Sequence, residues 1–421
     1  GMIIGMLLFG GIVDQFGRKT GAVATTILLV LGIALSAGAS GTTETGMFWM
    51  LIVARGIAGV GAGGEYPVSG AGATEATDEN KALRKHRGFM FAMLADLSAS
   101  LGYVFGGLVP LLLLLCTHRR ESSYGTVWRT SFALGLIPPI SIFWFRIRMA
   151  VSTAYRRSAM RRQRVPYVLA FRRYWRAFIG CSATWFLYNY VSIPFGIFSS
   201  TVTSRVNASD SLVKSLGWGV VINCFYIPGP FLGGYLSDKI GRRQTMCLGF
   251  ALQAGLGFIL GGANKQIQTV FPLFVVFFSV SIHVDTCHTQ GAPRLTKSKK
   301  KHSTVVLTAS ECFPTSIRGQ MMGLVSAFSK AGAAIGTQVF SAILKSWTDE
   351  SKADQATFLI GAAFAALGAV IAWFVIPDVS SRLDDEDEAW RRYLEENGWS
   401  AEWGDGATKD PGAVVMDRVA S

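Results

Sequence analysis

Apolar stretches long enough to cross a lipid bilayer recur along the whole chain, and they constrain its fold more than any other feature. A membrane-spanning helix needs about 20 predominantly apolar residues. Half of the 421 residues are hydrophobic and only 16% are charged, a balance typical of membrane proteins. The sequence therefore predicts an all-α integral membrane protein. The stretches near spanning length cover residues 20–40, 47–72, 88–115, 128–146, 177–203, 211–236, 245–263, 320–346 and 356–377.

Two shorter apolar stretches bring the number of candidate spans to eleven. Gly1–Val13 opens the chain without an initiating methionine, and Gln268–Ile282 ends at a polar segment. A pair of equal six-helix halves would need one more helix at the N-terminus. We therefore interpret the chain as lacking helix 1 and part of helix 2.

The net charge of +13 falls mainly on alternate loops. The loop after the first span carries Arg18 and Lys19, and ten arginines lie between Arg146 and Arg176. The loops on the other side hold far fewer basic residues, which is the bias that places basic loops in the cytoplasm. Because the basic residues are dispersed among loops and form no single face, we exclude nucleic acid as a partner.

A short charged motif occurs twice, each time directly after an apolar stretch. Glycine in such a motif lets helices approach closely. The aspartate caps or pairs across the loop, and the arginine binds carboxylates or helix C-termini of the opposite helical bundle. We predict that both copies gate the cytoplasmic side while two halves of the molecule rock against each other. The copies consist of Gly10, Asp14, Gly17, Arg18 and Lys19, and of Gly234, Asp238, Gly241, Arg242 and Arg243.

The doubled motif resembles the signature of the major facilitator superfamily, whose fold has two pseudo-symmetric six-helix bundles. The segments "RGIAGVGAGGEYP" (Arg55–Pro67) and "FSKAGAAIG" (Phe328–Gly336) resemble helices 4 and 11 of its phosphate-type members. "WFLYNYVSIPFGIFSS" (Trp185–Ser200) and the acidic tail resemble the fungal glycerophosphoinositol and glycerophosphodiester permeases. "ECFPTSIRG" resembles the cytoplasmic motif after helix 10, and its matching residues are Glu311, Pro314, Arg318 and Gly319.

The resemblance divides the chain into four parts. Residues 1–146 form an incomplete N-terminal bundle with helices 2–6, and residues 147–176 form a basic cytoplasmic linker. Residues 177–377 form a C-terminal bundle with helices 7–12, in which a polar insertion at 283–303 interrupts helix 10. Polar coil is not tolerated in contact with lipid, so the insertion either loops into water or is a gene-prediction error. Residues 378–421 are predicted to be a solvated acidic tail.

Helix 4 of this scheme carries two ionisable residues, Arg55 and Glu65. They lie ten residues apart, which is about 15 Å along one helix. An ionisable residue inside a membrane is costly enough to indicate function. We predict that Arg55 attracts an anion, that Glu65 carries a proton, and that Tyr66 donates a hydrogen bond to a phosphoryl oxygen. The alternative for Glu65 is a buried ion pair with a neighbour.

Lys330 in helix 11 is the strongest candidate for holding an anion, because a buried ammonium keeps its charge only beside a negative partner. The alternative is an ion pair with Glu65 or Asp96. Trp185 and Asn189 lie one turn apart in helix 7 and share a face. The resemblance implies substrate contact there, but phosphate-type members have aspartate where this chain has Asn189, and an amide carries no proton.

These features predict a proton-coupled importer of a phosphorylated anion, either a glycerophosphodiester or inorganic phosphate. Its expected partners are a small anionic substrate, protons and the lipid bilayer, and it is expected to work as a monomer in the plasma membrane. A sugar or organic-anion carrier is one alternative, and a receptor that has lost transport is another. The sequence has no nucleotide loop, nucleophile elbow or metal-spaced ligands, so we predict no enzyme activity, cofactor or metal.

Overall fold

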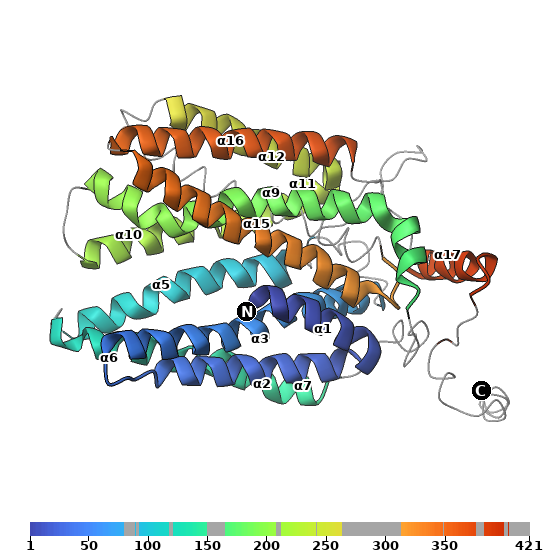
Figure 1. Ribbon diagram of the computed structural model, residues 1–421, viewed down its shortest axis with the longest axis horizontal. Coiled ribbons are helices and arrows are strands. Elements are labelled where there is room, and N and C mark those ends of the chain that lie inside the picture. The colour runs from blue at the N-terminus through green and yellow to red at the C-terminus, as the bar shows by residue number, and fades with distance from the viewer. Residues whose placement is uncertain are drawn as a thin grey trace.

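The computed structural model arranges its helices in two bundles that lie side by side (Figure 1). The N-terminal half contains α1 (Met2–Phe16), α2 (Arg18–Ala37), α3 (Glu44–Glu79), the π-helical turn η2 (Met93–Leu97), α5 (Ser98–Cys116), the short η3 (Glu121–Ser123), α6 (Tyr124–Leu134) and α7 (Ile137–Ile147). The structure describes residues 1–79, 89, 92–117, 121–149, 165–207, 212–240, 242–262, 313–347, 349–375, 383–399 and 403.

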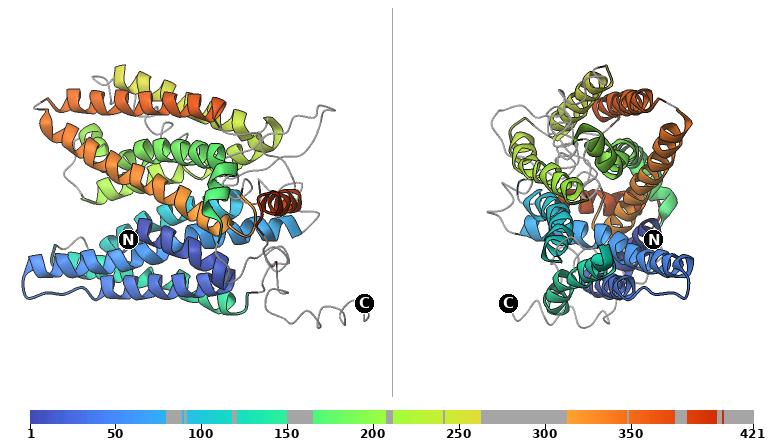
Figure 2. Two further views of the ribbon diagram at one scale, coloured as in Figure 1. Left: turned by 45° about the vertical axis from the view of Figure 1, so that its right-hand side comes forward. Right: turned by 90° about the vertical axis from the view of Figure 1, so that its left-hand side faces the viewer.

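The C-terminal half packs against the first half mainly through α15 and α1. The contact between α1 and α15 is therefore the largest part of the boundary between the two halves. The helices of this half are α9 (Tyr167–Asn207), α10 (Leu212–Cys224), α11 (Pro228–Ile240), α12 (Arg242–Gly262), α15 (Arg318–Ser346) and α16 (Glu350–Phe374). One more helix, α17 (Leu383–Glu396), follows the last span and lies at one end of the molecule (Figure 2).

Two of the predicted spans are broken near proline. The span predicted at 128–146 consists of α6 and α7, and α7 has proline in its first turn. The span predicted at 211–236 consists of α10 and α11, and Pro228 begins α11. Proline lacks the N–H of the helical ladder but fits the first turn of a helix. Each proline therefore starts a new helix and leaves a short turn before it.

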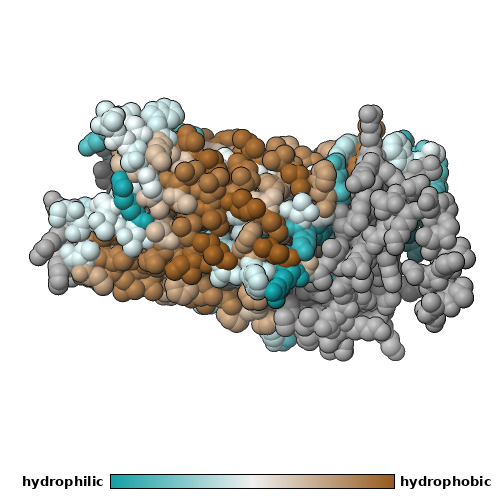
Figure 3. Space-filling model, turned by 90° about the horizontal axis from the view of Figure 1, so that it is seen from below, coloured by the Kyte–Doolittle hydropathy of each residue, from teal (hydrophilic) through white to brown (hydrophobic). Residues whose placement is uncertain are grey.

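Seven segments of the described chain are long and apolar enough to cross a membrane. On the face that Figure 3 shows, apolar residues cover the middle of the molecule and more polar residues lie toward both ends. The helices α9 and α15 are not among the seven; α9 begins with a cluster of arginines, and α15 carries Lys330 and several serines within its length. The chain is therefore a multi-pass membrane protein, as the sequence predicted.

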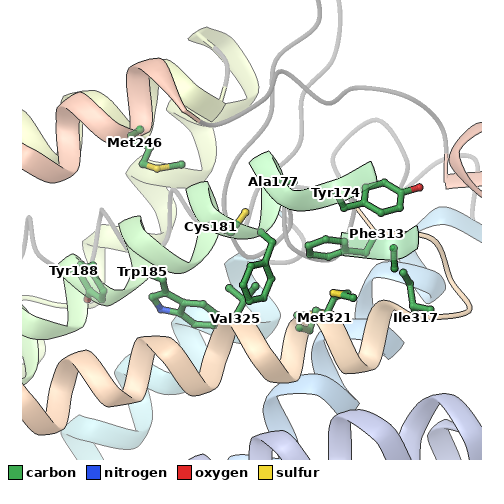
Figure 4. Close-up of a cluster of buried hydrophobic side chains, with 14 of the residues drawn as sticks. Tyr174, Ala177, Cys181, Trp185, Tyr188, Met246, Phe313, Ile317, Met321 and Val325 are labelled. Atoms are coloured by element: carbon green, nitrogen blue, oxygen red, sulfur yellow. The ribbon is translucent and has the colours of Figure 1, made fainter. Parts of the chain in front are cut away.

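An apolar cluster holds α9 against α15 in the C-terminal half (Figure 4). Trp185 of α9 points toward α15, which carries Met321 and Val325. These three residues and Cys181 of α9 are all buried. The backbones also approach closely, because a Cβ added at Gly336 would lie 2.4 Å from the carbonyl oxygen of Tyr190. Such dense packing makes the pair one stiff unit that presents polar residues to the other half.

The sequence predicts a solvated acidic tail, and for α17 this prediction is wrong. Trp390 and Leu394 of α17 are fully buried, and the indole of Trp390 lies 5.7 Å from the Tyr174 ring of α9, measured between ring centroids. The carboxylate of Asp387 accepts a hydrogen bond of 2.6 Å from the backbone N–H of Thr315. The sequence prediction missed this docking because the apolar residues of α17 are few and separated by acidic ones.

The boundary between linker and C-terminal bundle also differs from the prediction, because α9 begins at Tyr167 and not near residue 177. The apolar run Tyr167–Ala170 and the aromatic residues among the arginines favour a helix there. The predicted helix 10 at Gln268–Ile282 and the polar insertion at 283–303 lie outside the described residues.

Trp390→Ala is expected to release α17 from the helical bundle. Removing a fully buried tryptophan costs about 3–5 kcal/mol, and a free helix of this length is marginal in water. Hydrogen exchange of the α17 amides should therefore become much faster, while exchange in α12 stays unchanged. Arg392→Ala, on the exposed face of α17, is the matched control. Protection of α17 that survives Trp390→Ala would contradict the docking.

Candidate functional site

Four of the predicted substrate-binding residues meet where the two halves join. Tyr66 comes from α3 of the N-terminal half, Trp185 and Asn189 come from α9, and Lys330 comes from α15. Trp185 and Asn189 are buried, whereas Tyr66 and Lys330 are partly exposed. The site is therefore built by both halves, and the buried pair supports the partly exposed pair.

The ammonium of Lys330 is held between an amide and an aromatic ring. Its Nζ donates to Oδ1 of Asn189 at 3.4 Å and lies 5.1 Å from the centroid of the Tyr66 ring. A cation over an aromatic face is attracted by the ring quadrupole. The rings of Tyr66 and Trp185 lie 6.1 Å apart, so the aromatic pair forms one wall beside the ammonium.

Ser329 fixes the orientation of the Asn189 amide. The Nδ2 of Asn189 donates to Oγ of Ser329 at 2.6 Å and to the backbone carbonyl of Trp185 at 3.2 Å. With both donor hydrogens used in this way, the amide oxygen turns toward Lys330. The result is a cationic group beside hydrogen-bonding and aromatic surfaces, a combination that suits a small organic anion.

Arg55 is not gathered with these residues. Its guanidinium lies over the ring of Phe132 in α6, 5.3 Å from the centroid, and its side chain is exposed. Tyr66 lies eleven residues further along α3, which is about 16 Å along the helix axis. Substrate contact by Arg55 therefore stays a prediction.

Glu65 is adjacent to Tyr66 in sequence but faces the interior of the N-terminal half. Its carboxylate accepts two hydrogen bonds from the guanidinium of Arg146 in α7, one of them at 2.6 Å, and a further one from the hydroxyl of Thr25. Successive residues of a helix point about 100° apart, so Glu65 and Tyr66 reach different partners. This is the ion pair that the sequence left open as an alternative, and proton transport by Glu65 stays a prediction.

A buried cluster of four charges joins the two halves at the end where α17 lies. Arg18 donates to Asp14 at 2.6 Å and to Glu75 at 2.9 Å, and Arg318 of the C-terminal half donates to the same Glu75 oxygen at 3.2 Å. All four side chains are at most 2% exposed. Two carboxylates thus neutralise two guanidiniums away from water. We call Asp14, Arg18, Glu75 and Arg318 the gate cluster.

Backbone groups of the C-terminal half complete the gate cluster. The Asp14 carboxylate accepts from the N–H groups of Gly319 at 2.9 Å and Gln320 at 2.8 Å, so it caps the first turn of α15, where the helix dipole favours a negative charge. Arg18 also donates to the carbonyl of Thr315 at 3.2 Å. Asp14 and Arg18 therefore each bind both halves.

Glycines of α1 and α15 let the backbones of these two helices approach closely beside the gate cluster. A Cβ added at Gly10 would lie 2.9 Å from the carbonyl oxygen of Gly319, and one at Gly323 would lie 2.3 Å from that of Met6. Gly17 joins α1 to α2 with φ of 100°, a conformation that side chains disfavour. The spacing of glycine and aspartate in the motif thus has a structural cause.

The remaining motif residues are described less fully. Lys19 is exposed, and Gly234 is buried in α11. Pro314 is buried in the turn before α15, where its carbonyl accepts from the N–H of Ile317 at 3.1 Å. The described part of the chain does not include Glu311, Gly241 or the side chains of Asp238, Arg242 and Arg243. The gating role of the second copy of the motif therefore stays a prediction.

Sequence reasoning missed Glu75, Arg146 and Ser329. Glu75 lies in "ATEATDEN", where several carboxylates follow an apolar stretch and none stands out. Arg146 was counted among the linker arginines, although it ends the preceding span. Ser329 precedes Lys330 and has no distinctive spacing. A search for carboxylates near span ends, as partners for the motif arginines, would have found Glu75.

Comparisons with known proteins identify the family of the chain. Residues 1–290 match the family described as Major Facilitator Superfamily. Glycerophosphoinositol permease 1 of Candida albicans is 36% identical over 409 residues, covering 96% of this chain and 74% of the permease. Glycerophosphoinositol transporter 1 of Saccharomyces cerevisiae is 32% identical, covering 100% and 77%. Inorganic phosphate transporter PT2 of Toxoplasma gondii is 24% identical, covering 91% and 64%.

Solved structures share the fold at low sequence identity. The proton:xylose symporter XylE matches with a TM-score of 0.72 and 19% identity, covering 93% of this chain and 86% of the symporter. The fucose:proton symporter FucP of E. coli matches with a TM-score of 0.61 and 14% identity, covering 90% and 88%. The family match over residues 1–290, more than half of the chain, establishes that the chain belongs to the Major Facilitator Superfamily, and the shared two-bundle fold agrees with it.

Proposed function

We propose that this chain carries a phosphorylated anion across the plasma membrane by alternating access, as a monomer and together with protons. The substrate we propose is a glycerophosphodiester such as glycerophosphoinositol, with inorganic phosphate as the second choice. The names of the relatives at 36% and 32% identity support this order, since the phosphate transporter is only 24% identical. The activity is transport and not catalysis.

The observation that carries the proposal is the position of Lys330 between the two halves. Its ammonium offers donors to a phosphoryl oxygen, and Asn189 holds it with a neutral amide that adds no negative charge of its own. The partly exposed Tyr66 ring, backed by the buried Trp185, supplies apolar surface for the glycerol or inositol part of the substrate. A phosphodiester therefore finds both a charge and a wall for its uncharged portion.

The gate cluster gives the proposed transport cycle its closed side. Lys330 lies twelve residues beyond Arg318 on α15, or about 18 Å along the helix. While the gate cluster is formed, a substrate at Lys330 is separated from the cytoplasmic end. Release into the cell then requires that α1 and α15 separate, which breaks the bonds from Asp14 to the first turn of α15.

We propose Glu65 as the proton carrier, because the side-chain amide of Asn189 does not gain or lose a proton near neutral pH. Protonation of Glu65 would weaken its hold on Arg146 and leave a positive charge in the N-terminal half. The uncompensated positive charge of Arg146 would favour binding of the anionic substrate from the side of the membrane that supplied the proton. The proposal predicts that a proton gradient accelerates uptake by the unmodified chain.

A sugar carrier is the second candidate, because the Tyr66 and Trp185 ring pair also suits a sugar ring. A neutral sugar has no need of the Lys330 ammonium, so the two candidates differ in their response to loss of that charge. Competition by unlabelled hexose, inorganic phosphate and glycerophosphoinositol separates them directly.

Lys330→Gln is expected to lower the kcat/KM for uptake of labelled glycerophosphoinositol by about a hundredfold. Loss of a hydrogen bond to a charged group costs up to about 3 kcal/mol, which corresponds to about a hundredfold in an equilibrium constant. Uptake is measured in proteoliposomes with an imposed pH gradient. Lys345→Gln, on an exposed part of α15, is the matched control and is expected to leave uptake unchanged. Equal uptake by Lys330→Gln and the control, or inhibition by hexose alone, would refute the proposal.

A further inference from the structure

The first turns of α9 extend beyond the part of the helix that a membrane covers. At 41 residues, α9 is about 62 Å long, whereas the hydrocarbon core is about 30 Å thick. The Tyr174 ring lies 5.8 Å from the Phe313 ring, which precedes the start of α15, and 5.7 Å from Trp390 of α17. The segment around Tyr174 therefore lies level with the cytoplasmic ends of the spans.

This segment has two distinct faces. Ala170, Tyr174, Ala177 and Phe178 are buried against the protein. The opposite face is exposed over three turns and is both apolar and basic. It consists of Val168, Phe171, Arg172, Trp175 and Arg176, with Val168 81% and Trp175 49% exposed. We call this set the α9 outer face.

The arginines of this segment divide into one used within the protein and two left at the surface. Arg173 donates to the Tyr174 hydroxyl at 3.1 Å and lies 5.0 Å from the centroid of the Tyr393 ring in α17. Arg172 and Arg176 form no hydrogen bond or ion pair within the described part of the chain. They lie one helical turn apart, where like charges repel, and Arg176 rests over the Trp175 ring at 5.7 Å.

We propose that the α9 outer face binds the headgroup of an anionic phospholipid of the inner leaflet. Two guanidiniums one turn apart present parallel donors to a phosphate, which guanidinium binds in bidentate geometry. Trp175 and Phe171 lie beside them as apolar partners for the glycerol and upper acyl chains, since tryptophan favours the membrane interface. Basic residues at this depth attract anionic lipid. A lipid supplies both the charge and the apolar contact.

The proposal is tested with the purified full chain, by counting bound lipids with native mass spectrometry. The protein is presented with equal parts of phosphatidylcholine and phosphatidylinositol. We expect the unmodified chain to retain phosphatidylinositol in preference. The double variant Arg172→Gln with Arg176→Gln is expected to bind it about tenfold more weakly. Arg172→Lys with Arg176→Lys is expected to fall between the two, because it keeps the charge and loses the bidentate geometry.

Two controls decide the interpretation. Lys345→Gln with Lys352→Gln removes the same charge from residues at the opposite end of the spans, and it is expected to leave lipid retention unchanged. Thermal unfolding in phosphatidylcholine alone is expected to be the same for all variants. Equal phosphatidylinositol retention by the double variant and the unmodified chain would overturn the proposal. Displacement of the lipid by an equal concentration of soluble glycerophosphoinositol would also overturn it, because the apolar contacts to Phe171 and Trp175 would then contribute nothing to binding.

Discussion

Glu75→Gln is expected to open the cytoplasmic end of the protein and to reduce uptake more than tenfold. The Glu75 carboxylate faces both Arg18 and Arg318 in a site shielded from water, and its loss leaves one positive charge without compensation. Removing one partner of a buried ion pair costs about 3–5 kcal/mol. Hydrogen exchange of the Gly319 and Gln320 amides, which donate to Asp14, is expected to accelerate accordingly.

Charge balance provides the control for this prediction. Glu75→Gln combined with Arg318→Gln restores a neutral cluster, and we expect part of the amide protection to return. Glu388→Gln makes the same chemical change on the exposed face of α17 and is expected to change neither exchange nor uptake. If Glu75→Gln left the exchange of both amides as it was, the gate cluster would not hold the halves together.

Gly323→Ala is expected to prevent the two halves from closing at the cytoplasmic end. The added Cβ would lie 2.3 Å from the Met6 carbonyl oxygen and 3.2 Å from the Gly10 Cα, and neither backbone atom can turn aside. The helices α1 and α15 must then separate, which breaks the gate cluster. Uptake is expected to fall at least tenfold, and a cysteine introduced at buried Ser326 is expected to react faster with a cytoplasmic thiol reagent.

Gly106→Ala in α5 is the matched control, because a Cβ there meets nothing within 4 Å. Alanine is the better helix former by about 1 kcal/mol, so this variant is expected to be at least as stable as the unmodified chain and equally active. A Gly323→Ala protein with full uptake and an unreactive cysteine at position 326 would show that the α1 and α15 contact is not required for closing.

The lengths of the apolar stretches predicted the membrane-spanning helices, because the length needed to cross a bilayer is a strict constraint. The family resemblance of the doubled motif implied their arrangement in two bundles. The doubled motif also predicted that its arginine binds the opposite bundle. Arg18 does so through the Thr315 carbonyl, but both of its carboxylate partners, Asp14 and Glu75, belong to its own half. Other features depend on three-dimensional packing. The direction of Glu65 depends on whether α7 brings Arg146 near it, and the docking of α17 depends on two residues, Trp390 and Leu394.

The candidate site, too, could be predicted from the sequence only in part. Lys330 was found because a cation is unusual inside an apolar helix, and Asn189 because it shares a helix face with Trp185 and stands where the family resemblance implies an aspartate. The distance of Arg55 from them follows from the helix rise, but the sequence alone did not say which end of α3 faces the C-terminal half. Ser329 could be identified only from the structure, in which it accepts a hydrogen bond from Asn189.

The backbone of Thr315 forms two hydrogen bonds to side chains: its carbonyl accepts from Arg18, and its N–H donates to Asp387. Because α17 also packs on α9 through Trp390, it moves with the C-terminal half, whereas Arg18 moves with the N-terminal half. A spin label at exposed Arg392 on α17, paired with one at exposed Thr20 on α2, would thus report each opening as a change of one distance.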